Sequence, residues 1–189
     1  MMNTIQLAQT ISSMVQNGDY VLGHAIFKGR DTSADLPDKI LDEGLRIEDA
    51  SQGVPFTTRC FESDFNECLS NLLDLVSYSC GIVIIISIPK ELLESYDSKY
   101  FDSANNASVL LESTGEVSSY YHDLYGNPTQ VALLPPIYIL GYLDVQKDLF
   151  IENSSYAFGD GNRNISIMNL KPILDKRYEK VIQEYNRYS

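Results

Sequence analysis

The sequence predicts an α+β fold in which a split, antiparallel-rich sheet is flanked by helices. Stretches whose apolar residues recur every three or four positions, as in helices, alternate along the chain with short runs typical of strands. Six of the seven residues in the run Ile82–Ile88 are β-branched and apolar, with Ser87 as the exception, and the run ends at Pro89, which indicates a central strand covered on both faces. The length of 189 residues suits a single domain over residues 1–189 that buries a sufficient core without disulfides.

Caps and turn residues divide the first third of the chain into short elements. Asn17-Gly18 and Gly44 are typical helix stops, and Pro37 suits the first turn of a helix. The predicted elements are an amphipathic helix capped by Asn3 or Thr4 and ending at Gln16, a strand over Tyr20–Phe27, a helix capped by Asp35 and closed by Gly44, an extended piece over Leu45–Asp49, and a turn into a strand over Gly53–Phe61.

The remainder of the chain gives fewer clear boundaries. A helix capped by Ser63 is predicted to face the core with a set of apolar residues: Phe65, Cys68, Leu69, Leu72, Leu73 and Val76. After the central strand we expect a short helix over Lys90–Tyr96, a short strand over Val109–Leu111, a long loop over Glu112–Pro128, a strand over Ile137–Leu143, a polar loop over Phe150–Arg163 and a C-terminal helix over Leu170–Tyr188.

The charge balance limits the partners that the protein is expected to have. Fourteen basic and 26 acidic side chains give a formal net charge of −12, which argues against nonspecific binding to nucleic acid and against binding to an anionic membrane. No apolar run is long enough to cross a bilayer as a helix, and the first 15 residues lack the core of a signal peptide. We therefore expect a cytoplasmic protein, or an effector delivered without a classical signal peptide.

The cysteines do not predict a metal centre. The three of them, Cys60, Cys68 and Cys80, have no C-x-x-C spacing and no neighbouring histidine, so we expect no metal. An odd number of cysteines suits a reducing compartment. A cysteine–histidine hydrolase built from Cys60 or Cys80 with His24 or His122 stays open, because spacing in the sequence cannot show whether such pairs meet.

One of the two histidines stands out because it interrupts an apolar strand. His24 follows Gly23 and precedes Ala25, and the helix after this strand ends in Ile40-Leu-Asp-Glu-Gly-Leu45. This combination resembles the ADP-ribosyltransferase fold, in particular its diphtheria-toxin-like and poly-ADP-ribose-polymerase-like branch. Two further segments are similar to that family, Gly53–Thr58 and the proline-headed Leu134–Tyr142.

The resemblance implies a mono-ADP-ribosyltransferase-like protein that uses NAD as a substrate and modifies a macromolecular or small nucleophile. In that family a histidine binds the ribose, an aromatic side chain stacks on nicotinamide and an acid orients the attacking group. The resemblance therefore assigns NAD binding to His24, Ala25, Phe56, Thr57, Thr58 and Tyr121. The last predicted strand has no glutamate, so the catalytic acid falls to Glu116 or Glu112, with Asp144 as a further candidate.

Other interpretations of the same residues stay open. His24 also suits a core histidine, Thr57 and Thr58 suit ordinary strand positions, and Tyr120, Tyr121 and His122 suit either an aromatic lid or a surface loop. A catalytically inactive relative would act as an acidic protein-interaction or inhibitor module, and a mimic of a polyanion would do the same through its charge. The expected partners are a protein target or a cognate inhibitor.

Overall fold

The computed structural model describes residues 2–27, 34–48, 58–92, 116–122 and 128–172, together with residues 176 and 179. The described elements are, in chain order, α1 (Thr4–Gln16), β1 (Asp19–Phe27), α2 (Leu36–Glu43), β2 (Leu45–Glu48), β3 (Thr58–Cys60), α3 (Phe65–Tyr78), β4 (Ser79–Pro89), the 3-10 turn η1 (Lys90–Leu92), β5 (Glu116–His122), β6 (Pro128–Leu134), the 3-10 turn η3 (Pro136–Tyr138), β7 (Ile139–Asp144) and β8 (Leu149–Glu152). Residues 163–172 form a further helix.

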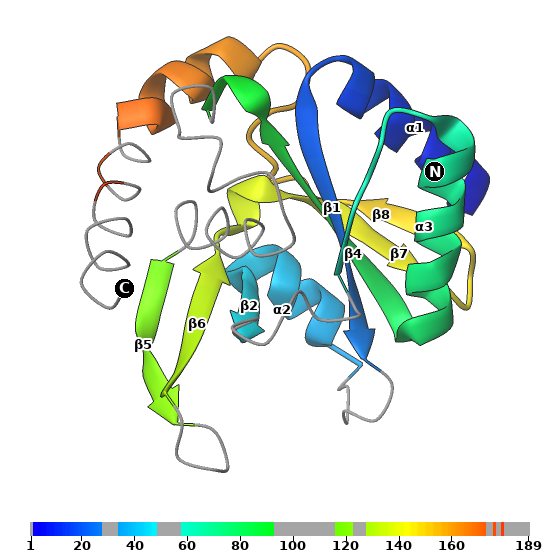
Figure 1. The fold of residues 1–189 in the computed structure, drawn as a ribbon, viewed down its shortest axis with the longest axis horizontal. Helices are drawn as coiled ribbons and strands as arrows, with labels where there is room; N and C mark the ends of the chain where they lie inside the picture. Colours follow the sequence, from blue (N-terminus) through cyan, green and yellow to red (C-terminus); the bar gives the residue numbers. More distant parts are fainter. Residues whose placement is uncertain are drawn as a thin grey trace.

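The strands form two antiparallel sheets, which confirms the predicted α+β class and the split sheet (Figure 1). The larger sheet has the order β3-β1-β4-β7-β8, and the smaller one has the order β2-β6-β5. Every described strand pair is antiparallel. The chain passes from the larger sheet into the smaller one through α2 and Gly44, whose φ of 100° is one that glycine adopts readily.

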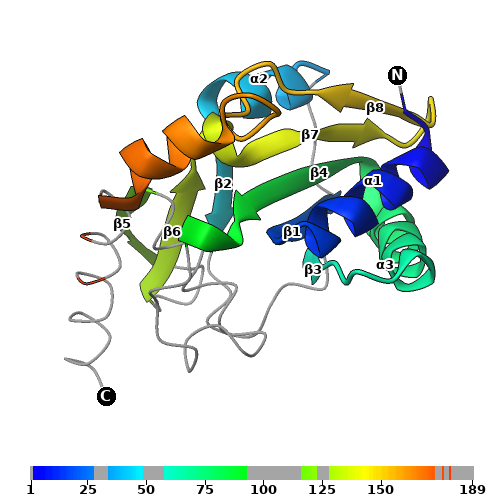
Figure 2. The same cartoon turned by 90° about the horizontal axis from the view of Figure 1, so that it is seen from above.

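Strand β4 lies at the centre of the larger sheet, as its sequence predicts. Val83 and Ile85 belong to a core cluster with α1 and α3, whereas Ile84, Ile86 and Ile88 belong to a second cluster with α2, η3 and residues 156–158. All five side chains are fully buried. Figure 2 shows α1 and α3 side by side, and two hydrogen bonds from α1 reach the carbonyl oxygen of Ser63, just before α3. Burial on both faces therefore makes β4 the strand on which both layers of helices pack.

Some predicted helix ends are confirmed and others are wrong. Asn3 caps α1 with a complete capping box, as predicted. Asp64, not Ser63, caps α3, because its carboxylate accepts hydrogen bonds from the backbone N–H groups of Asn66 and Glu67 at 2.8 and 3.0 Å. Asp35 is the N-cap residue of α2, as predicted, but its side chain makes no capping hydrogen bond and forms an ion pair with Lys39 instead.

Leu73 was predicted to face the core and instead is 51% exposed. The buried positions of α3 are Cys68, Leu72 and Leu75, which follow a spacing of four and then three residues. Leu73 lies about 100° around the helix from Leu72, so it points away from this stripe. The position of Leu75, which the prediction omitted, completes the buried face.

The C-terminal third of the chain contains strands where loops were predicted. β5 lies inside the predicted loop over Glu112–Pro128 and pairs with β6, and β8 begins the predicted polar loop over Phe150–Arg163. The predicted strand over Ile137–Leu143 starts later, at Ile139, because Pro136 opens a 3-10 turn. Both errors occur in short segments, where pairing with a neighbour decides the structure more than local pattern does.

Two further predicted helices have different boundaries in the structure. The predicted helix over Lys90–Tyr96 is described as a 3-10 turn over Lys90–Leu92, and its remainder lies outside the described residues, as does the predicted strand over Val109–Leu111. The last helix starts at Arg163 and not at Leu170. Its inner face includes Ile167 and Leu170, which pack on the core.

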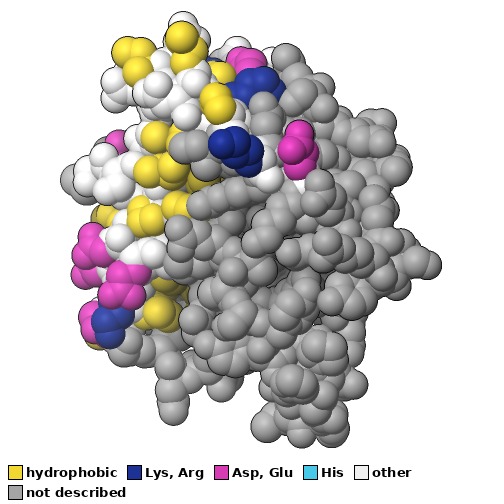
Figure 3. Space-filling view, turned by 90° about the vertical axis from the view of Figure 1, so that its left-hand side faces the viewer, with side chains coloured by type: hydrophobic (Ala, Val, Ile, Leu, Met, Phe, Trp, Pro, Cys, Tyr) yellow, Lys and Arg dark blue, Asp and Glu magenta, His cyan; other side chains and the backbone are white. Residues whose placement is uncertain are grey.

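The helix over residues 163–172 also carries apolar side chains at the surface. Ile165 and Met168 are 64% and 77% exposed. Figure 3 shows the side of the molecule on which this helix lies, with hydrophobic side chains visible there. A patch made by two side chains is of ordinary size for a protein surface and carries no functional argument.

Gly141 is predicted to be essential for the packing of β7 against β8. A Cβ atom there would overlap the carbonyl oxygen of Ile151 and lie 2.7 Å from the ring of Phe150. We expect Gly141→Ala to destabilise the protein by about 1–3 kcal/mol, because the backbone of the edge strand cannot yield without breaking its pairing. Urea denaturation measures this. Gly159→Ala is the matched control, since a Cβ there meets nothing within 4 Å; equal unfolding midpoints for both variants would contradict the prediction.

Candidate functional site

His24 lies in the middle of β1, one strand from the edge of the larger sheet. Its register partners are Thr58 in β3 and Ile84 in β4. Side chains alternate between the faces of a strand, so His24 shares a face with Leu22 and Ile26, which belong to the core cluster that includes α2. The histidine is half-buried. The imidazole therefore lies at the border between this core cluster and the open edge of the sheet.

The strand–helix–strand unit predicted around His24 is formed. Ile40 of α2 is 5% exposed and packs in the same cluster as Leu22 and Ile26. α2 ends at Gly44, after which Leu45 begins β2 and is itself buried. β2 then pairs with β6 in the smaller sheet. The helix α2 makes its main contacts with η3 and β7 and leads directly into the smaller sheet.

Ala25 occupies the opposite face of β1 from His24. It is 1% exposed and packs in the cluster formed with α1 and α3. Its methyl group is consequently enclosed by the two helices. Any contribution of Ala25 to a ligand on the His24 face would come from its main chain.

The other predicted site residues lie in different parts of the structure. Thr58 is opposite His24 in the register, whereas Glu116 and Tyr121 lie in β5 of the smaller sheet, opposite Leu133 and Thr129 of β6. Phe56, Thr57 and Glu112 lie outside the described residues. His24 and Thr58 are therefore brought together, and the predicted acid and aromatic residue of β5 belong to the other sheet.

Asp144, the further candidate for the acid, is engaged in a local structure at the end of β7. Its carboxylate accepts a hydrogen bond from Lys147 Nζ at 2.7 Å and from the backbone N–H groups of Gln146 and Lys147, each at 3.1 Å. The hydrogen bond from Lys147 lowers the pKa of Asp144. These contacts fix the turn into β8, which accounts for this carboxylate without a catalytic role.

The Cys60 and Cys68 thiols do not have the properties of catalytic nucleophiles. Burial raises the pKa of Cys60, and it raises the pKa of Cys68 to about 11. A nucleophilic cysteine requires the opposite shift, because the thiolate is the reactive form. The Cys68 thiol donates to the carbonyl oxygen of Glu62 at 2.8 Å, and Cys68 is a buried packing residue as predicted.

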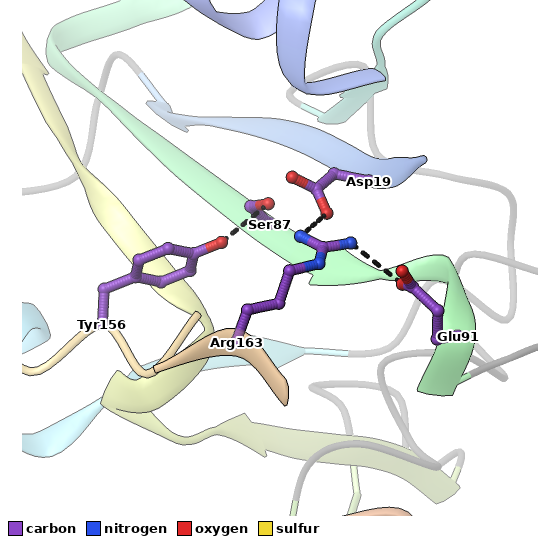
Figure 4. A network of polar contacts seen from close by, with 5 residues as sticks. All are labelled: Asp19, Ser87, Glu91, Tyr156 and Arg163. Carbon is purple, nitrogen blue, oxygen red and sulfur yellow. Dashed lines mark hydrogen bonds and ion pairs between the residues drawn. The ribbon is translucent and has the colours of Figure 1, made fainter. Parts of the chain in front are cut away.

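A second polar group, which the sequence did not predict, joins three segments at one end of the larger sheet (Figure 4). The Arg163 guanidinium donates to Asp19 Oδ1 at 2.5 Å and to Glu91 Oε2 at 2.9 Å. The Asp19 side chain is only 6% exposed, whereas that of Glu91 is 44% exposed. We call this group, with Ser87 and Tyr156, the Arg163 cluster. It ties the start of β1, the turn η1 and the last described helix to one another.

The Arg163 cluster continues through a hydroxyl pair. The Tyr156 hydroxyl donates to Ser87 Oγ at 3.0 Å, and Ser87 is fully buried in β4. Burial raises the pKa of Tyr156 to about 12. The phenol therefore stays neutral over the physiological range and serves as a hydrogen-bond donor.

An open cavity of about 650 Å³ adjoins this cluster. Its polar lining includes Thr10, Asp19, Asn153, Tyr156, Asp160 and Arg163. The buried Asn153 side chain is fully used, since its amide nitrogen donates to the carbonyl oxygens of Pro136 and Ile139 and its oxygen accepts from the Ser155 backbone. The Arg163 guanidinium is shared between two carboxylates. The cavity wall is thus built largely from groups that already satisfy one another.

Sequence reasoning missed the Arg163 cluster because its partners are far apart in the chain. Asp19 and Arg163 are separated by 144 positions, and Glu91 and Arg163 by 72. The sequence did contain one local signal, an aspartate at the start of an apolar strand, where a carboxylate must find a partner if it is buried.

Comparison with known proteins, the grouping of metal-ligating side chains and the character of the helices give three negative findings. No family model, curated protein or solved structure matches the chain. Among the residues that the structure describes, no three histidine, cysteine or acidic side chains are grouped so that they would hold a metal ion. In the same part of the chain no helix has the length and apolar character needed to cross a membrane.

Arg163→Ala is expected to destabilise the fold because it leaves the Asp19 carboxylate buried without this partner. Loss of a charged hydrogen bond of this kind costs about 1.5–3 kcal/mol. Urea denaturation at neutral pH measures the effect. Lys147→Ala is the control, because it removes an exposed ion pair. The double variant Asp19→Asn/Arg163→Ala should recover part of the loss, and a single variant as stable as wild type would refute this role.

The raised pKa of Tyr156 predicts a loss of stability at alkaline pH. An unfolded tyrosine ionises near pH 10, whereas the folded protein keeps the Tyr156 proton up to about pH 12. The stability supplied by the neutral phenol is therefore complete below about pH 10 and is lost as the pH rises toward 12. Over this pH range, the free energy of unfolding obtained from denaturation curves should fall less steeply with pH for Tyr156→Phe than for the wild type. Ser87→Ala breaks the same hydrogen bond but keeps the ionising group, so its unfolding free energy should depend on pH as steeply as that of the wild type. An equal pH dependence for the wild type and Tyr156→Phe would contradict the assignment of this loss to Tyr156.

Proposed function

We propose that this protein is an ADP-ribosyltransferase-like protein that binds NAD on the His24 face of β1 and transfers ADP-ribose to a macromolecular or small nucleophile. The observation that carries the proposal is the register of β1: Thr58 is directly opposite His24, and α2 and β2 follow as one unit. The resemblance implies a strand opposite the histidine and a helix of this form after it. The half-buried position of His24 also suits a side chain that holds a ligand at the sheet edge.

The chemistry of this reaction sets what the residues must do. The bond between the ribose C1′ and the nicotinamide nitrogen breaks, and its electron pair stays on the nicotinamide ring. The nucleophile then attacks C1′, which carries positive charge, and gives its proton to a carboxylate or to solvent. A held ribose, an aromatic shelf and a nearby carboxylate stabilise this oxocarbenium-like state.

The residues of this chain divide these tasks under the proposal. His24 hydrogen-bonds the ribose, with Thr57 and Thr58 on the neighbouring strand and the main chain of Ala25 beside it. Phe56 or Tyr121 supplies the aromatic shelf. Glu116 is the preferred acid because it belongs to a strand, β5, and Glu112 is the second choice. The negative charge of the chain gives no general attraction for NAD, so binding must come from such local contacts.

The proposal predicts that NAD binding depends on His24. Calorimetric titration with NAD should show binding by the wild type and a loss of about tenfold or more in affinity for His24→Ala, which corresponds to about 1.4 kcal/mol or more. Ser13→Ala, on the exposed face of α1, is the control and should bind as the wild type does. Circular dichroism checks that each variant is folded. Equal binding by wild type and His24→Ala, or no binding by the wild type, would remove the proposal.

The alternative is a catalytically inactive relative that acts as an acidic protein-interaction or inhibitor module. The observation that favours this alternative is that Glu116 lies in the smaller sheet, whereas His24 lies in the larger one. Incubation of the protein and a cell lysate with labelled NAD distinguishes the two. Label transfer that is abolished in both His24→Ala and Glu116→Gln supports the enzyme. NAD binding without any transfer supports the inactive module.

A further inference from the structure

Cys60 lies on the same face of the larger sheet as His24, at its edge. Cys60 of β3 is opposite Leu22 of β1, and the next pair on this face is His24 with Thr58. Paired residues in antiparallel strands point their side chains to the same face, and diagonal neighbours have Cα atoms about 7–8 Å apart. A ligand of the size of NAD that contacts His24 on this face therefore also reaches Cys60.

The Cys60 thiol is held in place by its neighbours. It shares a hydrogen bond with the Tyr20 hydroxyl, and it lies 3.9 Å from the carbonyl oxygen of Phe61, to which it donates. Tyr20 is itself on the His24 face, two positions before Leu22, and packs against the same core cluster. The residue as a whole is nevertheless exposed, since β3 is an edge strand.

The charges around Cys60 are balanced. Glu62 and Lys90 both act on the thiol, the first raising and the second lowering its pKa. Burial is the largest effect and raises this pKa, so the thiol is protonated at neutral pH. A protonated thiol adds no negative charge next to the diphosphate of a dinucleotide, whereas a thiolate would repel it.

We infer that Cys60 is a positioning residue on the His24 face of the larger sheet, whose small neutral thiol, fixed by Tyr20, forms part of the surface against which NAD lies. This inference rests on the proposed function. It assigns to Cys60 a role in shape and orientation and none in bond making. A larger side chain at this position should consequently obstruct the ligand, whereas a serine should be tolerated.

The first arm of the test compares bulky substitutions at the two edges of the same sheet. Cys60→Phe is expected to weaken NAD binding in calorimetry by about tenfold or more, whereas Cys60→Ser should stay close to wild type. Ile151→Phe is the matched control, because Ile151 lies in the opposite edge strand, β8, in the same cross-strand row as His24. Thermal unfolding of all variants shows whether weaker NAD binding comes from obstruction at the His24 face or from misfolding.

The second arm uses the native cysteine and needs no variant. N-ethylmaleimide alkylates a thiol by addition of the sulfur to its double bond, with the proton passing to the neighbouring carbon, and peptide mass spectrometry reports each cysteine separately. Saturating NAD should slow alkylation of Cys60 several-fold and leave the buried Cys68 unchanged.

The two arms separate failure of this inference from failure of the proposed function. NAD binding that needs His24 but is unaffected by Cys60→Phe, with unprotected Cys60, would overturn the inference and leave the proposed function standing. No NAD binding by the wild type would overturn both. Weakened binding by Cys60→Phe, normal binding by Cys60→Ser and Ile151→Phe, and protection of the native thiol together would establish the role.

Discussion

The burial of β4 on both faces is the constraint on which the rest of the structure depends. Its isoleucines and valine alternate between two core clusters, so each cluster loses its centre if the strand moves. Burial of such side chains is worth about 1.5–3 kcal/mol each. The strands β1 and β7 are positioned by pairing with β4, and His24 takes its place from its pairing with Ile84. The candidate site is thus fixed by the most buried part of the protein.

Polar contacts hold the two ends of the larger sheet, beyond the part that is buried by apolar side chains. At one end, Asp148 at the turn into β8 accepts hydrogen bonds from the backbone and side chain of Thr4, and Met2 pairs with Phe150. At the other end, the Arg163 cluster joins β1, η1 and the last described helix. These contacts connect residues distant in the sequence. They fasten α1 and the last described helix to the ends of the sheet, so the positions of these helices relative to the strands are fixed.

The sequence predicted those features that depend on local pattern, and it missed those that depend on distant pairing. The central strand, the capping of α1 by Asn3 and the unit of β1, α2 and Gly44 follow from periodicity and from glycine and cap chemistry. β8 and β5 were taken for loops because short strands are stabilised chiefly by their neighbours. For the site, the resemblance assigned both His24 and Thr58 to one ligand, and the register places them opposite each other. The Arg163 cluster was not, because no sequence spacing brings Asp19 to Arg163.

The residues of the proposed site are divided between two sheets, and α2 connects the strand that carries His24 to the smaller sheet. His24 is fixed in the larger sheet by β4, and Glu116 is fixed in the smaller sheet by β6, which in turn pairs with β2. Along the chain, β1 of the larger sheet is connected to β2 of the smaller sheet through α2 and Gly44. Catalysis needs a carboxylate held within about an ångström of its working position relative to the ribose. Ile40 and Leu45 both pack in the core cluster that contains Leu22 and Ile84, so their packing sets where the smaller sheet lies relative to the histidine strand.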